Sequence, residues 1–225
     1  MSDGAPDPLT SFISRSLRVP VSDVREEILQ DTTEVELDRI HFTQDGSART
    51  LIIKRMPLHD ALEVKLLPHL ARKTDRVPSV HARGIPPATA AGWPWLLVED
   101  LLDAPPACDD LEAIVAAKLV VERAVAQDGP ALVALGVPRI VSRGALAAWP
   151  EVIVHGALTC ANAVRAIRGV VLVDWRHASL GCGLLDMVRL ARDAGVPVTG
   201  LAELYASLAG RSVDAATVAA AEALI

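Results

Sequence analysis

The sequence predicts an α+β protein in which an antiparallel sheet comes first and a mainly helical half follows. Two apolar runs, at residues 35–42 and 49–55, flank Asp45 and Gly46, and this pattern is typical of a β-hairpin. From residue 110 onward, apolar residues recur at helical spacing. Aromatic residues make up only 3% of the chain, so Ala, Leu and Val must build most of the core, which favours closely packed helices.

The first half begins, after an unstructured start, with an amphipathic helix at residues 8–17. Leu9, Phe12 and Ile13 share one face of it, and Asp7 caps its first turn. Strands and one helix follow. We expect strands at residues 23–29, 35–42, 49–55, 77–84 and 95–101, and a helix at residues 59–72.

The second half contains the central helix, at residues 110–127, with Asp109 or Asp110 as its cap. Prolines interrupt the chain beyond it and limit the next two helices to short segments. Short apolar strands and further helices complete this half. We expect helices at residues 129–136, 142–148, 201–208 and 213–224, another that continues from Asp186, and strands at residues 151–154 and 169–175.

Composition disfavours several classes of function. The chain has 225 residues and is 51% hydrophobic, which suffices for one large domain or two small lobes. A net charge of −6 without a cluster of Lys and Arg disfavours nucleic-acid binding. The start lacks a basic and apolar signal, and no apolar run reaches membrane-spanning length. We therefore expect a cytoplasmic protein without nucleic-acid or membrane partners.

The cysteines give a second indication of compartment. Cys108, Cys160 and Cys182 are odd in number, far apart and without the spacing of metal ligands. We therefore expect no disulfide framework and a reducing environment.

The polar residues that carry chemistry cluster between residues 151 and 186. An apolar strand leads into His155 and Gly156, Asn162 follows in a polar loop, and a second strand ends at Asp174. The ends of the two strands place Asn162 and Asp174 in one small space, and an amide together with a carboxylate suits a Mg²⁺ ion.

This segment resembles the catalytic loop and metal-binding strand of the aminoglycoside phosphotransferase and choline kinase families. These small-molecule kinases share the protein-kinase-like two-lobe fold, and their pattern is His-Gly-Asp, Asn, Asp-Trp or Asp-Phe, Gly, and an Asp that opens a helix. The matching residues here are His155, Gly156, Asn162, Asp174, Trp175, Gly181 and Asp186. The resemblance implies that Asn162 and Asp174 hold Mg²⁺, that His155 has a structural role, and that Asp186 braces the loop.

The resemblance extends to the first half. Lys54 follows three apolar strand residues and would contact ATP phosphates, while Glu63 on the next helix would orient it. Taken alone, Lys54 would be read as a solubilising charge on an edge strand. Backbone groups near Glu99 and Leu101 resemble the family's adenine-binding hinge. The implied lobes are residues 1–101, which bind nucleotide, and residues 102–225, which are helical and reduced in size.

The chain departs from the family pattern at two sites. Ala157 stands where the family has its catalytic Asp, and a methyl group cannot accept a proton from a substrate hydroxyl. The loop that would face the phosphates lacks glycine. Thr32 and Thr33 could donate hydrogen bonds there, but Asp31 and Glu34 would repel a triphosphate.

Two classes of function remain open on the sequence alone. One is an ATP- and Mg²⁺-dependent phosphotransferase that acts slowly on a small hydroxylated acceptor. The other is a catalytically silent relative, a pseudokinase, that binds a nucleotide, a metabolite or a protein partner. Ala157, the acidic phosphate loop and the short helical lobe favour the second class.

Overall fold

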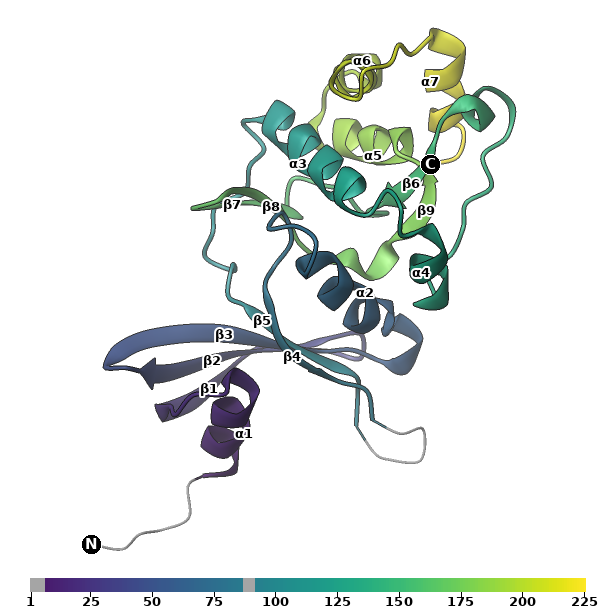
Figure 1. The fold of residues 1–225 in the computed structure, drawn as a ribbon. Helices are drawn as coiled ribbons and strands as arrows, with labels where there is room; N and C mark the ends of the chain where they lie inside the picture. The colour runs from purple at the N-terminus through teal and green to yellow at the C-terminus, as the bar shows by residue number, and fades with distance from the viewer. Residues whose placement is uncertain (1–6, 87–91) are drawn as a thin grey trace, which may run out of the picture. The chain divides into compact units, whose positions relative to one another are not determined.

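The computed structural model describes residues 7–86 and 92–225, so the N-terminal stretch predicted to be unstructured lies outside the described residues except at its end (Figure 1). The chain divides into two compact units. The first contains Met1–Val64 and Ser79–Leu102, and the second contains Lys65–Pro78 and Asp103–Ile225. The predicted α+β class is confirmed, because the sheet lies in the first unit and most helices lie in the second.

The first unit is built on a five-stranded antiparallel sheet in the order β1-β2-β3-β5-β4. Its strands are β1 (Ser22–Asp31), β2 (Glu36–Gln44), β3 (Ser47–Arg55), β4 (Val80–Gly84) and β5 (Trp95–Glu99). Each predicted strand of this half is present, with bounds that differ by a few residues. β3 pairs with both β2 and β5, so it lies inside the sheet and is not an edge strand.

The predicted hairpin turn joins β2 to β3. Gln44 faces Ser47 across the end of the ladder, and both central residues have positive φ, at 49° for Asp45 and 74° for Gly46. Left-handed conformations at both positions match the right-handed twist of the paired strands, and Asp-Gly tolerates them. The local sequence therefore sets the register of β2 against β3.

Helix α1 (Pro8–Leu17) covers one side of this sheet in Figure 1, and Asp7 caps it by accepting a 3.1 Å hydrogen bond from the Thr10 amide. Ile13 is fully buried. It packs in a cluster with residues of β2, β3 and β5, namely Ile40, Phe42, Leu51, Ile53 and Leu97. Because strand side chains alternate between faces, Leu51 and Ile53 point toward this cluster while Ile52 and Lys54 point to the opposite face.

The second unit consists of helices around two small two-stranded sheets. Its helices are the end of α2 (Leu62–Ala71), which follows the 3₁₀ turn η1 (Leu58–Asp60), then α3 (Leu111–Ala124), α4 (Gly129–Ala134), α5 (Leu184–Ala194), α6 (Val198–Leu208) and α7 (Ala215–Glu222), with 3₁₀ turns η2 (Gly144–Ala148) and η3 (Trp175–His177). Within this unit, α6 packs against both α3 and α5, and α7 packs against α5. Among the described helices, none has the length and apolarity to cross a membrane.

The small sheets contain two strands that were not predicted. The predicted strands β6 (Glu151–Val154) and β8 (Gly169–Leu172) are present, and they lie in different sheets. β6 pairs with β9 (Ser179–Cys182), and β8 pairs with β7 (Ala163–Ala166). The sequence did not indicate β7 or β9, because four residues with at most one strongly β-prone side chain carry little signal and are held in place by their partners.

The cysteine prediction was wrong. Cys108 and Cys160 form a disulfide across 52 residues, and only Cys182 is free. Their proximity comes from backbone pairing between neighbouring residues, because the Ala107 amide donates to the Ala163 carbonyl at 2.8 Å. Sequence spacing alone does not reveal a single bridge of this kind.

Candidate active site

Lys54 and Glu63 form an ion pair in the first unit. Lys54 lies on β3 on the face opposite α1, and Glu63 lies in the first turn of α2. The Lys54 Nζ is 2.5 Å from a Glu63 carboxylate oxygen, and the Glu63 side chain is only 3% exposed. An ammonium group paired with a buried carboxylate at this distance is held in a fixed position. The structure thus brings these two predicted residues together.

The segment after β5 is held to the sheet by polar contacts. The Glu99 amide donates to the Ser79 carbonyl at 3.0 Å, and the Glu99 carboxylate accepts from the Ser79 amide at 3.1 Å. Asp100 pairs with Arg39 of β2 at 2.7 Å, a contact that the sequence did not predict. Leu101 follows this anchored pair and is half-buried. These contacts hold the backbone near Glu99 and Leu101 in one place.

The predicted phosphate loop is a tight turn between β1 and β2. The Thr32 hydroxyl donates to the Val35 carbonyl at 3.0 Å and accepts from the Val35 amide at 3.1 Å. Thr33 is exposed and follows Asp31 of β1. The Thr32 hydroxyl thus stabilises the turn itself, and both threonines are exposed.

His155 lies in the second unit, just after β6, and is fully buried. One ring nitrogen, Nε2, lies 2.9 Å from the Val173 carbonyl, and the other accepts a 3.3 Å hydrogen bond from the Ala157 amide. Its ring also packs 4.5 Å from that of Trp175. Burial lowers the pKa of His155, so it stays neutral with both nitrogens occupied. This arrangement supports a structural role.

Asp186 fixes the start of the loop from helix α5. Its carboxylate accepts hydrogen bonds from the amides of His155, at 2.7 Å, and Gly156, at 3.0 Å. Gly156 has φ of 83°, and a Cβ there would overlap the His177 carbonyl, so no other residue fits. Two amides on one carboxylate define the backbone direction through the loop.

Asn162 directly precedes β7, and Asp174 lies two residues after the end of β8, at the same end of the β7–β8 ladder. The Asn162 carbonyl accepts a 2.9 Å hydrogen bond from the Val173 amide, the residue directly before Asp174. The Asn162 side-chain amide donates to the Ala157 carbonyl at 2.8 Å. Asp174 has a left-handed backbone, with φ of 64° and ψ of 66°, and its carboxylate lies 3.3 Å from the Arg176 Nε. Left-handed backbone at a residue other than glycine is costly and concentrates at functional sites.

Ala157 is held by its backbone on both sides. Its amide bonds to His155 and its carbonyl to Asn162, so the loop conformation does not depend on the side chain at this position. The residue is half-buried. The second unit therefore contains an ordered loop with a methyl group where the resemblance implies a catalytic carboxylate.

Comparisons with known proteins agree on the architecture. No protein-family model matches the sequence, and no curated protein matches it either. Solved structures do match. A candidate aminoglycoside phosphotransferase from Ralstonia eutropha has 15% identity and a TM-score of 0.62, over 95% of this chain and 84% of that one. Macrolide 2′-phosphotransferase MphH from Brachybacterium faecium has 16% identity and a TM-score of 0.59, over 97% and 88% of the two chains.

A choline kinase from Cryptosporidium parvum also matches, with 8% identity and a TM-score of 0.59 over 82% of this chain and 72% of that one. The chain has the kinase-like phosphotransferase fold. The predicted two-lobe architecture is thus confirmed at the level of the fold. At identities of 8–16%, the similarity concerns the fold and not the substrate or the activity.

A buried charge network next to the loop that begins at His155 was not predicted from the sequence. Lys118 of α3 is fully buried; it pairs with Glu122, lies 3.3 Å from Asp186 and donates to the Ile153 carbonyl at 2.7 Å. Tyr205 of α6 donates to Glu122 at 2.9 Å. The sequence did contain a signal for it. Lys118 and Glu122 are spaced i, i+4 on the apolar face of the predicted helix, whereas a solvent-exposed ion pair would lie on the polar face.

The free energy of unfolding should decrease as the pH is lowered beneath about 6.5, because of His155. Burial lowers its pKa, the Asp186 and Asp174 carboxylates oppose that shift, and the Lys118 ammonium adds to it. The unfolded chain protonates this residue near its ordinary pKa of 6.5, whereas the folded chain does not. The unfolded state then binds the extra proton, which costs the fold up to about 1.4 kcal/mol per pH unit.

Thermal denaturation at pH 7.5, 6.5 and 5.5 measures this effect. His155→Gln should have a flatter pH dependence than the parent, while His59→Gln, which alters an exposed ring, should not. His81, whose pKa burial also lowers, accounts for a remaining slope in every variant. Equal slopes in the parent and in His155→Gln would refute the assignment.

Proposed function

We propose that this chain is a small-molecule phosphotransferase-type protein that binds Mg²⁺-ATP weakly and transfers phosphate slowly or not at all. The observation that carries the proposal is the ordered loop of the second unit. In this loop a backbone hydrogen bond joins Asn162 to the residue before Asp174, and Ala157 occupies the position where the resemblance implies a proton acceptor.

Asn162 and Asp174 supply a donor set that fits Mg²⁺. The Asn162 side-chain nitrogen is used by the Ala157 carbonyl, so its amide oxygen is the atom available to ligate a cation. An amide oxygen and a carboxylate are hard donors of the kind that Mg²⁺ prefers. The ion would neutralise phosphate charge during transfer. Arg176 lies 3.3 Å from Asp174 and competes for this carboxylate, which supports weak metal affinity.

Lys54 is proposed to contact the nucleotide phosphates. The buried Glu63 carboxylate holds its ammonium group, as a phosphate-binding lysine requires. Backbone groups near Glu99 and Leu101 are proposed to bind adenine, and Thr33 to approach the phosphates. Glu34 and Asp31 in the same turn carry negative charge and no glycine provides amides, so we infer low nucleotide affinity.

Turnover is limited by Ala157. Without a carboxylate there, the acceptor hydroxyl keeps its proton until a weaker base or water removes it. Phosphoryl transfer depends chiefly on positioning and charge neutralisation, so slow transfer can persist without that base. The alternative function, a slow kinase of a small hydroxylated acceptor, therefore differs from the silent binder only in rate. A third candidate function is that a catalytically silent protein binds a protein partner.

Mg²⁺-ATP should stabilise the protein, and the effect should depend on Asp174. At 100 times the dissociation constant, a single site adds about 2.7 kcal/mol, or roughly 5–10 °C in melting temperature for a chain of this size. A thermal-shift titration to millimolar Mg²⁺-ATP measures it. Asp174→Ala should lose the shift, and Glu203→Ala, which removes an exposed carboxylate of α6, should keep it.

The outcomes separate the candidates. No shift at millimolar Mg²⁺-ATP, with Asp174→Ala indistinguishable from the parent, would leave only a scaffold that binds a protein or metabolite. A shift together with rapid turnover of amino-sugar, choline-like or hydroxylated acceptors by the parent would establish the kinase, with another group taking the proton.

A further inference from the structure

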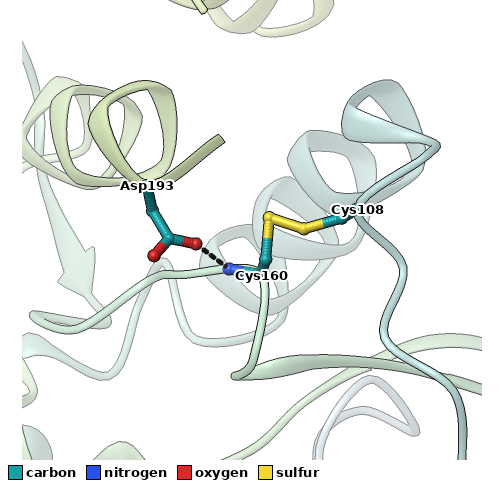
Figure 2. Close-up of side chains that lie close together, drawn as sticks. All are labelled: Cys108, Cys160 and Asp193. Atoms are coloured by element: carbon teal, nitrogen blue, oxygen red, sulfur yellow. Dashed lines mark hydrogen bonds between the residues drawn. A yellow bond between two sulfur atoms is a disulfide. The ribbon is translucent and has the colours of Figure 1, made fainter. Parts of the chain in front are cut away.

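The Cys108–Cys160 disulfide lies next to the loop that carries Asn162. Cys160 is two residues before Asn162, and Cys108 lies in the segment that leads into α3. Figure 2 shows the bond between the two segments with Asp193 of α5 beside it. The bond therefore joins the segment before α3 to the turn at residues 159–163, which contains Asn162.

The two cysteines are held together by more than their bond. The Ala107 amide donates to the Ala163 carbonyl and the Arg165 amide to the Pro105 carbonyl, both at 2.8 Å. Asp193 accepts a 2.7 Å hydrogen bond from the Cys160 amide, and this contact is visible in Figure 2. These contacts do not involve sulfur. The sulfur atoms therefore stay close when the bond is broken, and the bond can form again without refolding.

The cysteines also differ in access. Cys108 and Cys160 are half-buried, within reach of a small thiol reagent. Cys182 is buried, and burial raises the pKa of its thiol to about 11, which keeps it protonated and inert. Thiol chemistry in the folded chain is thus confined to the pair.

The hydrogen bonds within this turn are weak, although Asp193 and the Val173 amide hold it from outside. The Asn162 amide donates to the Thr159 carbonyl at 3.2 Å, and the Ala163 amide to the Cys160 carbonyl at 3.3 Å, both long for such bonds. Cys160 is one of the two inner residues between Thr159 and Asn162, so a covalent bond there restricts the motion of the turn.

We propose that Cys108 and Cys160 form a reversible thiol–disulfide site whose state sets how firmly the turn holds Asn162. The oxidant is a low-molecular-weight disulfide of the glutathione class. One protein thiolate attacks it, forms a mixed disulfide and releases one small thiol. The second protein thiolate displaces the other small thiol, so two protein thiols become one disulfide while the reagent gains two electrons and two protons. A consequence for metal binding at Asn162 rests on the proposed function, whereas the thiol–disulfide site does not.

Thiol counting tests the chemistry. The protein is equilibrated with mixtures of reduced and oxidised glutathione, acid-quenched, alkylated in denaturant and weighed intact. The oxidised form should have one reactive thiol and the reduced form three. Alkylation of the reduced protein without denaturant should label two thiols and spare Cys182. One reactive thiol in every mixture, or three in every mixture, would overturn reversibility.

Hydrogen exchange tests the effect on the turn, with no nucleotide present. Reduction should speed exchange of the Asn162 and Ala163 amides by about tenfold or more. The Leu172 amide, which donates to the Arg76 carbonyl, should be unaffected. Cys108→Ser should match the reduced protein in both redox states, while Cys182→Ala should keep the parent's response. Equal exchange in oxidised and reduced protein would overturn the proposal even if the thiol counts agree.

The alternative to a thiol–disulfide site is a metal site at the same residues. The ligand atoms of Cys108, Cys160 and Asp193 lie within 4.8 Å of one another, close enough for a soft divalent ion to bind the reduced pair. If Zn²⁺ alone restores slow exchange to the reduced protein, and Asp193→Asn abolishes that rescue, the cluster is a metal site and the redox proposal fails. Unchanged exchange with Zn²⁺ supports the thiol–disulfide site. Neither readout depends on Mg²⁺-ATP binding, so the proposed function can fail separately.

Discussion

Ala157→Asp should raise Mg²⁺-dependent ATP turnover by at least about tenfold over the parent. A positioned general base contributes on the order of 10²–10⁴ to a rate, and this change places a proton acceptor five residues before Asn162, where the resembling families have one. The backbone at this position is already held by His155 and Asn162, and the side chain is half-buried. A larger polar side chain therefore does not require the loop to refold.

Two matched variants isolate the base. Ala157→Asn has nearly the same size and polarity as the aspartate but cannot take the proton, so it should stay at the parent's rate. Ala157→Asp combined with Asp174→Ala should also show no gain, because the metal donor is lost. The assay is steady-state ATP hydrolysis with and without a panel of small hydroxylated acceptors.

The result distinguishes the two functional classes. A gain confined to Ala157→Asp would mean that nucleotide and metal are already positioned in the parent, which makes it a kinase lacking its base. An equal gain in Ala157→Asn would contradict proton acceptance and point to an electrostatic or structural effect. No gain in any variant, with Mg²⁺-ATP binding intact, would support a silent binder.

Lys118→Met should destabilise the protein by about 3–5 kcal/mol. The ammonium is fully buried and pairs with Glu122 and Asp186. Burial disfavours its charge, but the Glu122 and Asp186 carboxylates outweigh that effect and raise its pKa, so Lys118 is charged in the fold. Removing one partner of a buried ion pair leaves uncompensated buried charge, which is among the largest effects of a single substitution. Urea denaturation measures the loss.

The second partner provides the decisive control. Lys118→Met together with Glu122→Gln removes one of the stranded charges and should recover part of the loss, because the glutamine side chain still accepts from the Tyr205 hydroxyl. Lys73→Met, which removes a half-exposed partner of Asp128, should cost less than about 1 kcal/mol. A loss below about 1 kcal/mol for Lys118→Met would show that the network contributes little to stability.

Hairpins and caps could be predicted from the sequence because they depend on neighbouring residues. Asp7 caps α1 and Asp110 caps α3, and the turn at Asp45 and Gly46 sets β2 against β3. The loop motif was also predicted from the sequence, since His155, Asn162 and Asp174 have the spacing on which the resemblance rests. Their roles in binding remain predictions, because the geometry shows contacts and not ligands.

The sequence by itself determined the α+β class, the helices and the loop motif, because periodicity, capping and turn chemistry act over a few residues. Only the tertiary structure decided the pairing of β6 with β9, the burial of Lys118 beside Asp186 and the bond between Cys108 and Cys160. Each of these joins segments at least 25 residues apart. Such contacts form where packing brings the chain together, and no local pattern encodes that distance.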